Sequence, residues 1–227
     1  MVKENIKIEN LSKSYPEGED RRIVLDDCSF TIEAGKMTSL VGKSGSGKTT
    51  ILNLLGGLMP ADQGHIYLDG EDITTYSENE LDDYRAEKIG FIFQDFELIE
   101  DFTVEENICL VSDLYQKERN QKRLNELLQH LELTDLKDHL PSQLSGGEKQ
   151  RTAIARALYP SPSLVLADEP TGNLDRIRSK QVFDLLRENC FLFDQTILIV
   201  THDLSLAKQA DQILVLEDGK VSRYESD

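Results

Sequence analysis

Residues 42–49 read Gly-Lys-Ser-Gly-Ser-Gly-Lys-Thr, and they stand between the apolar run 37–41 and a helical pattern at 50–58. The octet satisfies the pattern GxxxxGK[ST], in which glycines let backbone N–H groups point inward at phosphate oxygens. The helix that follows adds its positive N-terminal end to the same site. Lys48 is expected to reach the β- and γ-phosphates, and Thr49 to offer a hydroxyl to Mg²⁺. A chance glycine-rich turn is the competing interpretation, and the flanking patterns disfavour it.

The segments on either side of this cradle predict strands and helices in a particular order. Apolar positions at residues 6–11, 23–32 and 65–68 are typical of strands, with a polar loop at 16–22 between the first two. Beyond residue 164, strand-like runs alternate with helical ones, which is the order of a parallel α/β sheet.

These patterns predict an α/β fold with a P-loop NTPase core, whose sheet is mostly parallel, an antiparallel β subdomain and an inserted helical subdomain. Apolar residues recur at spacings of three and four over 103–133, so the helical subdomain is expected at about residues 95–160. The core and β subdomain are expected at about 1–94 and 161–227. Capping boxes are expected at three helix starts, Ser77 with Glu80, Thr103 with Glu106, and Ser145 with Glu148.

The composition of the 227 residues excludes several classes of protein. With 25 basic and 42 acidic residues the formal charge is −17, which disfavours broad binding to nucleic acid or anionic lipid. Three widely spaced cysteines, Cys28, Cys109 and Cys190, fit reduced thiols in a cytoplasmic protein. No apolar run reaches the roughly 18 residues that a spanning helix requires, so any membrane contact is expected to be peripheral.

Two acids follow the apolar run 164–167, at the end of a predicted buried strand. Ligands of open α/β sheets bind at the carboxyl ends of the strands. Asp168 therefore suits Mg²⁺, and Glu169 can orient or deprotonate an attacking water. The alternative is a strand that simply ends in two solvated acids, and the nearby phosphate cradle favours hydrolysis instead.

A second candidate anion site begins at Leu144-Ser145-Gly146-Gly147-Glu148. Two glycines expose backbone donors at the start of the helical run that follows. An ordinary capped helix would explain Ser145 and Glu148, but two glycines there are costly unless the backbone must approach a ligand closely.

Taken together, these motifs make the chain resemble the ABC ATPase family from Ile6 to Arg223. Beside the P-loop, residues 42–49, stand the LSGGE signature at 144–148, the strand ending in Asp168-Glu169, Gln94 after IGFIF, Asn173-Leu174-Asp175, and His202 after ILIVT. The resemblance implies a head-to-tail homodimer in which the signature of one chain completes the ATP site on the P-loop of the other.

The same resemblance assigns roles by position. It implies that Gln94 contacts Mg²⁺ or the lytic water, that His202 holds the γ-phosphate and Glu169 together, and that Lys48, Glu169, Gln94 and His202 form the catalytic set. Mg²⁺ would be held by Thr49, Gln94 and Asp168. ATP would be bound by Tyr15, which stacks on adenine, by Asp175 near the interface, and by Gly42, Ser44, Gly45, Ser46, Gly47, Lys48, Thr49, Thr50, Ser145, Gly146 and Gly147. The alternative for Tyr15 is a side chain that only packs a turn before Pro16.

Residues 169–175 and the segment 96–107 look like one bacterial branch of the family, which serves lipoprotein release, macrolide or antimicrobial-peptide export and resistance, and cell division. Its members pair with an integral membrane permease that has an extracytoplasmic domain, so the chain would lie on the inner face of the cell membrane. Segment 96–107 would dock that partner, or else merely pack under the helical lobe. Lys43, where proline is common, and Glu148-Lys149-Gln150 depart from the pattern without removing a phosphate or metal ligand.

Other classes remain as alternatives. A soluble ABC ATPase of translation or DNA repair usually has tandem cassettes or a long coiled-coil insert, and neither is present. A GTPase would carry an NKxD-like motif. An inactive regulator is opposed by intact Lys48, Asp168, Glu169 and His202.

Overall fold

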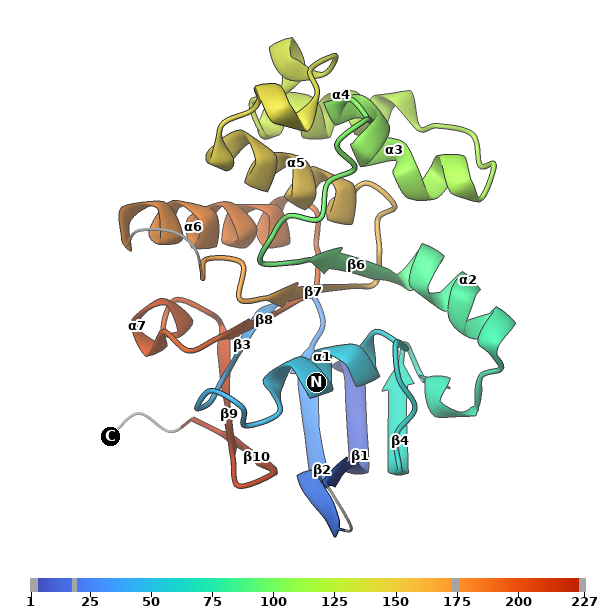
Figure 1. Ribbon diagram of the computed structural model, residues 1–227, viewed down its shortest axis with the longest axis vertical. Coiled ribbons are helices and arrows are strands. Elements are labelled where there is room, and N and C mark those ends of the chain that lie inside the picture. Colours follow the sequence, from blue (N-terminus) through green and yellow to red (C-terminus); the bar gives the residue numbers. More distant parts are fainter. Residues whose placement is uncertain (1–3, 18–19, 173–175, 225–227) are drawn as a thin grey trace.

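The computed structural model describes residues 4–17, 20–172 and 176–224, and its strands form two sheets (Figure 1). The first sheet is antiparallel, in the order β2-β1-β4-β5. The second has the order β10-β9-β3-β8-β7-β6 and is parallel except for its edge strand β10. The strands are β1 Glu4–Glu17, β2 Asp20–Glu33, β3 Met37–Val41, β4 Gln63–Leu68, β5 Glu71–Asp72, β6 Ile89–Ile92, β7 Leu164–Asp168, β8 Ile197–Thr201, β9 Gln212–Glu217 and β10 Lys220–Arg223.

Helices cover the parallel sheet on both faces (Figure 1). α1 lies between the two sheets, whereas α3, α4 and α5 form a layer at the top of the view, with α6 between that layer and the sheet. The helices are α1 Lys48–Leu55, α2 Glu78–Lys88, α3 Val104–Leu114, α4 Gln121–His130, α5 Gly146–Leu158, α6 Arg176–Leu192 and α7 Leu204–Ala207, with short 3-10 turns at Ile73–Thr75, Thr134–Leu136 and Pro141–Gln143. Among the described residues, no helix combines the length and the hydropathy that a membrane-spanning segment requires.

Strict alternation along the central strands divides their side chains between two hydrophobic cores. In β7, Leu164 and Leu166 pack toward α1 and the antiparallel sheet, while Val165 and Ala167 pack toward the helical layer. β8 alternates in the same way. A strand with apolar residues on both faces must be covered on both, which is why these runs read as continuously hydrophobic in the sequence.

Local signals at the helix starts are confirmed. Each of the three expected capping boxes has both of its reciprocal hydrogen bonds, at the starts of α2, α3 and α5.

The polar loop expected at 16–22 is wrong, because β1 continues to Glu17 and β2 begins at Asp20. Paired backbone hydrogen bonds sustain this projecting hairpin, so its side chains need not be apolar.

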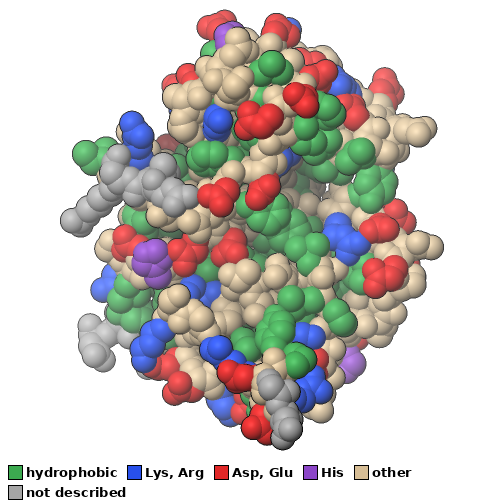
Figure 2. All heavy atoms as spheres, in the orientation of Figure 1, with side chains coloured by type: hydrophobic (Ala, Val, Ile, Leu, Met, Phe, Trp, Pro, Cys, Tyr) green, Lys and Arg blue, Asp and Glu red, His purple; other side chains and the backbone are tan. Residues whose placement is uncertain are grey.

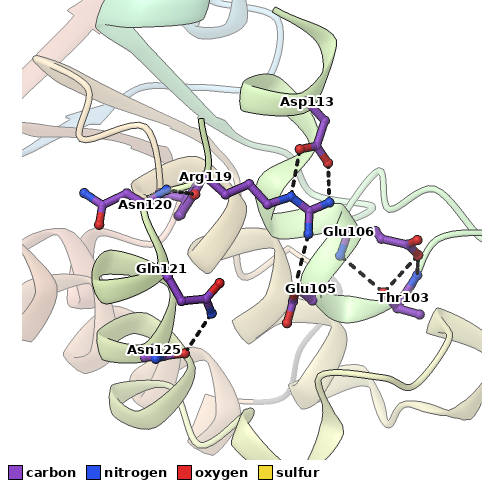
Figure 3. Close-up of polar contacts among 9 residues, drawn as sticks. Thr103, Glu105, Glu106, Asp113, Arg119, Asn120, Gln121 and Asn125 are labelled. Carbon is purple, nitrogen blue, oxygen red and sulfur yellow. Dashed lines mark hydrogen bonds and ion pairs between the residues drawn. The ribbon is translucent and has the colours of Figure 1, made fainter. Parts of the chain in front are cut away.

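The connection between α3 and α4 is fixed by Arg119 (Figure 3). Its Nε and Nη2 donate to the two carboxylate oxygens of Asp113, at 2.8 and 2.6 Å, and Nη1 lies 3.3 Å from Glu105. Both acids belong to α3, so the guanidinium of Arg119 holds the segment between α3 and α4 against α3.

Candidate functional site

Four neighbouring parallel strands deliver the main sequence motifs to one edge of the sheet. Their order is β3, β8, β7 and β6, and each motif stands at or just after the carboxyl end of its strand. The P-loop follows β3, His202 follows β8, Asp168 and Glu169 end β7, and Gln94 lies two residues beyond β6. Because the strands are parallel, segments far apart in the sequence meet at this edge.

The P-loop turns directly into α1, and Gly47 shapes the junction. Gly47 caps the helix at φ 106°, with no side-chain hydrogen bond to the first N–H groups. A Cβ at this position would lie 2.5 Å from Cγ1 of Val24, so both the backbone angle and the space require glycine. The helix start thus keeps its donors for an anion.

Lys48 lies across the loop that precedes it. Only 6% of the residue is exposed, and its Nζ donates to the carbonyl oxygens of Gly42 and Lys43, both at 3.0 Å. The P-loop borders a cavity of about 450 Å³, a size suited to a nucleotide. Its walls comprise Tyr15, Pro16, Glu17, Arg22, Val24, Ser44, Gly45, Gly47, Lys48, Thr49, Thr50 and Glu169.

Tyr15 forms one wall of this cavity. Its hydroxyl lies 3.3 Å from Oγ1 of Thr50 and donates to Sδ of Met59 at 3.3 Å. Arg22 stands opposite Tyr15 in the β1–β2 register and donates from Nη2 to the carbonyl of Gly45 at 3.3 Å. No sequence motif indicates Arg22, because only the register of the hairpin brings it beside the P-loop.

Asp168 and Thr49 place two oxygen atoms together at the end of β7. Burial raises the pKa of the Asp168 carboxyl, and the negative charge of Glu169 acts in the same direction. The hydrogen bond from Thr49 and the charge of Lys48 oppose this rise. A carboxylate beside a hydroxyl is a donor pair that Mg²⁺ accepts.

Glu169 and His202 are in direct contact. Oε2 of Glu169 lies 2.6 Å from Nδ1 of His202. The backbone of Glu169 is left-handed, with φ 44°, and its N–H donates to the carbonyl of Val200 at 3.0 Å, so the turn is anchored on β8. His202 precedes Asp203, whose carboxylate caps α7 by accepting from the N–H groups of Ser205 and Leu206.

Gln94 reaches the turn that begins at Glu169. A Cβ built on Gly172 would lie 3.1 Å from both Cδ and Nε2 of Gln94, so the amide lies closely against this turn. The structure thus brings Gln94, Glu169 and His202 to one region. Asp175, with Asn173 and Leu174, lies outside the described residues.

The signature lies apart from the P-loop of its own chain. Residues 144–148, all of them described, line no part of the P-loop cavity. α5 belongs to the helical layer at the top of Figure 1, whereas α1 lies below the parallel sheet. Ser145 caps α5 by accepting from the N–H of Glu148 at 3.4 Å, and a Cβ on Gly146 would have no atom within 4 Å. Packing within the chain therefore does not demand glycine at Gly146.

Segment 96–107 has both buried and exposed apolar groups. Ile99 and Phe102 are 38% and 37% exposed, while Ile108, just beyond it, is fully buried in the helical layer. Leu114 and Tyr115, at the end of α3, are also exposed.

Comparisons with known proteins agree with this arrangement. A family model described as ABC transporter matches residues 25–172. The lipoprotein-releasing system ATP-binding protein LolD of Treponema denticola is 42% identical over 224 residues, which cover 97% of this chain and 99% of the relative. The protein of the same name from Pseudomonas syringae pv. tomato is 44% identical over 215 residues, or 93% of this chain and 94% of the relative.

Solved structures have the same fold. The dimeric structure of the ATP-binding cassette MJ0796, in a post-hydrolysis state bound to ADP and Pi, matches with a TM-score of 0.84 and 35% identity, over 98% of this chain and 100% of that one. cbiO1 of Clostridium perfringens, part of the ABC transporter complex cbiONQ, matches with a TM-score of 0.86 and 28% identity, over 97% and 87%. The predicted fold class is confirmed, and the chain belongs to the ABC transporter family, as an ATP-binding subunit that hydrolyses ATP.

Proposed function

We propose that the chain works as a head-to-tail homodimer, in which the P-loop of each copy and the signature of the other enclose one ATP. One observation carries this proposal: the signature lines no part of the P-loop cavity of its own chain. The open space around Gly146 suits the approach of a ligand held by another copy. A two-fold pairing supplies each cavity with a second helix N-terminus. The related cassette MJ0796 is a dimer.

In each cavity the P-loop and Tyr15 hold ATP. Tyr15 stacks on the adenine, while Ser44, Gly45, Ser46 and Thr50 surround the phosphates. When ATP binds, Lys48 releases the two carbonyl oxygens that it contacts and donates to β- and γ-phosphate oxygens instead. Hydrogen bonds between its ammonium group and phosphate are charge-assisted, so they are stronger than those to the carbonyls.

Hydrolysis uses the pair formed by Glu169 and His202. The carboxylate of Glu169 takes the proton of the attacking water, which is general-base catalysis. His202 faces Glu169 through Nδ1; with both ring nitrogens protonated, it donates from Nδ1 to Glu169 and from the other nitrogen to the γ-phosphate. The short contact therefore fixes the base and the phosphate relative to each other.

Mg²⁺ fits beside Thr49, Asp168 and Gln94. The hydroxyl of Thr49 is hydrogen-bonded to Asp168, so these two oxygens converge. Across the described parts of the chain, no group of three or more His, Cys, Asp or Glu side chains could hold a metal ion, and phosphate oxygens and water would complete the coordination of Mg²⁺ here. When bound, Mg²⁺ neutralises negative charge that develops on the phosphates.

The cellular process proposed for this ATPase is lipoprotein release, as for the relatives named LolD. The partner is a membrane permease with an extracytoplasmic domain, and the chain lies peripherally on the inner face of the cell membrane. Figure 2 shows apolar side chains grouped where the helical layer meets the lower part of the molecule. The exposed Ile99 and Phe102 of segment 96–107 suit docking of the permease. Residues 95–160 are the helical subdomain that carries this surface, and about 1–94 and 161–227 form the core with its β subdomain.

Sharing of the site between chains is tested by mixing two inactive variants. Lys48→Ala disables the P-loop, and Ser145→Arg disables the signature. A mixed dimer has one intact P-loop paired with one intact signature, so ATPase activity should return on mixing, toward half of the wild-type value per mixed dimer. Complete absence of activity and of ATP-dependent dimer in the mixture would contradict the shared site.

The process is tested with the chain and its co-purifying membrane subunits in proteoliposomes that contain an acylated lipoprotein. ATP should release the lipoprotein to a soluble acceptor, and Glu169→Gln should abolish release. ATPase stimulation by a macrolide or a cationic peptide, with no lipoprotein released, would contradict this assignment.

A further inference from the structure

The loop that carries Gln94 toward α3 has an unfavourable backbone at two successive positions. Phe96 and Glu97 both have left-handed angles, with φ 63° and 49°. Each such residue other than glycine costs roughly 1 kcal/mol or more. Two local hydrogen bonds support the turn, from Phe96 N–H to the Phe93 carbonyl at 3.3 Å and from Glu97 N–H to the Asp95 carbonyl at 2.7 Å.

A guanidinium from the signature helix binds this strained turn. Arg156 of α5 donates from Nη2 to the carbonyl of Phe96 at 2.7 Å and from Nη1 to the carbonyl of Glu97. Burial lowers the pKa of Arg156, and the charge of Glu97 opposes that shift. The fork geometry of guanidinium lets one side chain hold two successive carbonyls, which an ammonium group cannot do.

The far end of the same loop is held by a different helix. Asn107 of α3 is fully buried, and its Oδ1 accepts from the N–H of Ile99 at 2.8 Å. Its Nδ2 donates to the carbonyls of Ile99, Phe102 and Thr103 at 2.9–3.1 Å. Arg156 therefore binds the turn next to Gln94, whereas the contacts of Asn107 begin only at Ile99.

We infer that Arg156 is a positioning residue for the ATPase reaction: by binding the carbonyls of Phe96 and Glu97, it keeps the side chain of Gln94 over the turn of Glu169 and Gly172. Arg156 lies on the helix that begins at the signature, so it also fixes Gln94 relative to that helix. This inference rests on the proposed role of Gln94 as a ligand of Mg²⁺.

The test compares purified variants of the full chain for ATP turnover, for the Mg²⁺ concentration that gives half-maximal activity, and for binding of a fluorescent ATP analogue in EDTA. Arg156→Ala should lower kcat and raise the half-saturating Mg²⁺ concentration, each roughly tenfold or more, as when a ligand loses its supporting hydrogen bonds. Analogue binding in EDTA should change less than about twofold, because the P-loop cavity is untouched. Arg156→Lys should lie between Arg156→Ala and wild type.

Two further variants separate positioning from a general loss of structure. Lys149→Ala removes a charge from the same helix, where its Nζ lies 3.8 Å from the exposed Glu100, and should behave as wild type. Glu97→Gly relieves the left-handed cost, so it should restore part of the activity of Arg156→Ala and of Arg156→Lys. Because relief of this strain also stabilises the fold, the rescue is scored on the half-saturating Mg²⁺ concentration, which general stabilisation of the fold would not change.

Each result decides between defined outcomes. Wild-type kcat and Mg²⁺ dependence in Arg156→Ala would overturn the inference, and so would an equal loss of analogue binding in EDTA. If Arg156→Ala does not fold, an unchanged Mg²⁺ dependence in Arg156→Lys would overturn it. Gln94→Ala identifies which proposal has failed. If Gln94→Ala leaves the Mg²⁺ dependence unchanged, the proposed role of Gln94 itself is wrong. If Gln94→Ala shifts the half-saturating Mg²⁺ concentration and Arg156→Ala does not, only the inference on Arg156 is rejected.

Discussion

Replacing Glu169 by glutamine should separate ATP binding from hydrolysis. The change keeps the shape of the side chain, and the amide oxygen can still accept a hydrogen bond from Nδ1 of His202, now 2.6 Å from Oε2. The turn held by the bond to Val200 should survive as well. What is lost is the basic oxygen that takes the proton of water, and loss of a general base lowers kcat about 10²- to 10⁴-fold.

The assay measures phosphate release and, in parallel, size-exclusion elution with ATP and Mg²⁺. Glu169→Gln should bind ATP and elute at twice the monomer mass, because the dimer that ATP closes is no longer opened by hydrolysis. Glu217→Gln is a matched control, since its carboxylate is 62% exposed and pairs with Lys43 at the P-loop, 3.3 Å away. The control should have wild-type turnover. A Glu169→Gln protein that hydrolyses ATP within about twofold of wild type would refute the assignment of the base.

Three further predictions concern stability. Burial raises the pKa of Asp168 in the folded state, so this group stabilises the fold only while protonated, and that contribution is lost as pH rises through its folded pKa. Asp168→Asn should therefore raise the melting temperature at pH 7 by about 2 °C, and this gain should vanish at acidic pH. The same substitution should abolish ATPase activity. Asp62 has its pKa lowered to about 2, mainly by the hydroxyl of Ser14, so Asp62→Asn should cost about 1 kcal/mol of unfolding free energy at pH 7, and urea titrations should show this difference disappearing as pH falls from about 4 to 2. Arg119→Ala should lower the free energy of unfolding by about 1 kcal/mol through loss of the bidentate ion pair with Asp113. A double-mutant cycle with Asp113→Ala should give this coupling energy in low salt and a smaller one in high salt.

Each of these stability predictions has an outcome that contradicts it. An Asp168→Asn protein less stable than wild type at pH 7 would mean that the hydrogen bond from Thr49 outweighs burial. A pH-independent effect of Asp62→Asn would rule out titration as its cause. Additive single and double variants at Arg119 and Asp113 would show that the pair contributes nothing beyond its separate residues.

Several features of this protein follow from local chemistry and can be predicted from short stretches of the chain. The P-loop octet, the acids after an apolar run and the three capping boxes are each defined by residues close together in the chain, so spacing alone fixes their backbone requirements. Gly47 illustrates this, since a left-handed helix cap calls for glycine before any tertiary contact is considered. The alternation of strands and helices likewise predicts a parallel sheet, because a crossover helix returns the chain in the same direction.

Which of these motifs come into contact depends on the tertiary fold. The order β3-β8-β7-β6 is not the order in the chain, and it places His202 against Glu169 and Gln94 against Gly172. Hairpin register brings Arg22 beside the P-loop, and helix packing brings Arg156 to the turn after Gln94. It also separates the signature from the P-loop cavity of the same chain. Strand order and helix packing are set by how the two cores on either face of the sheet are filled, and this depends on the whole chain rather than on any short pattern.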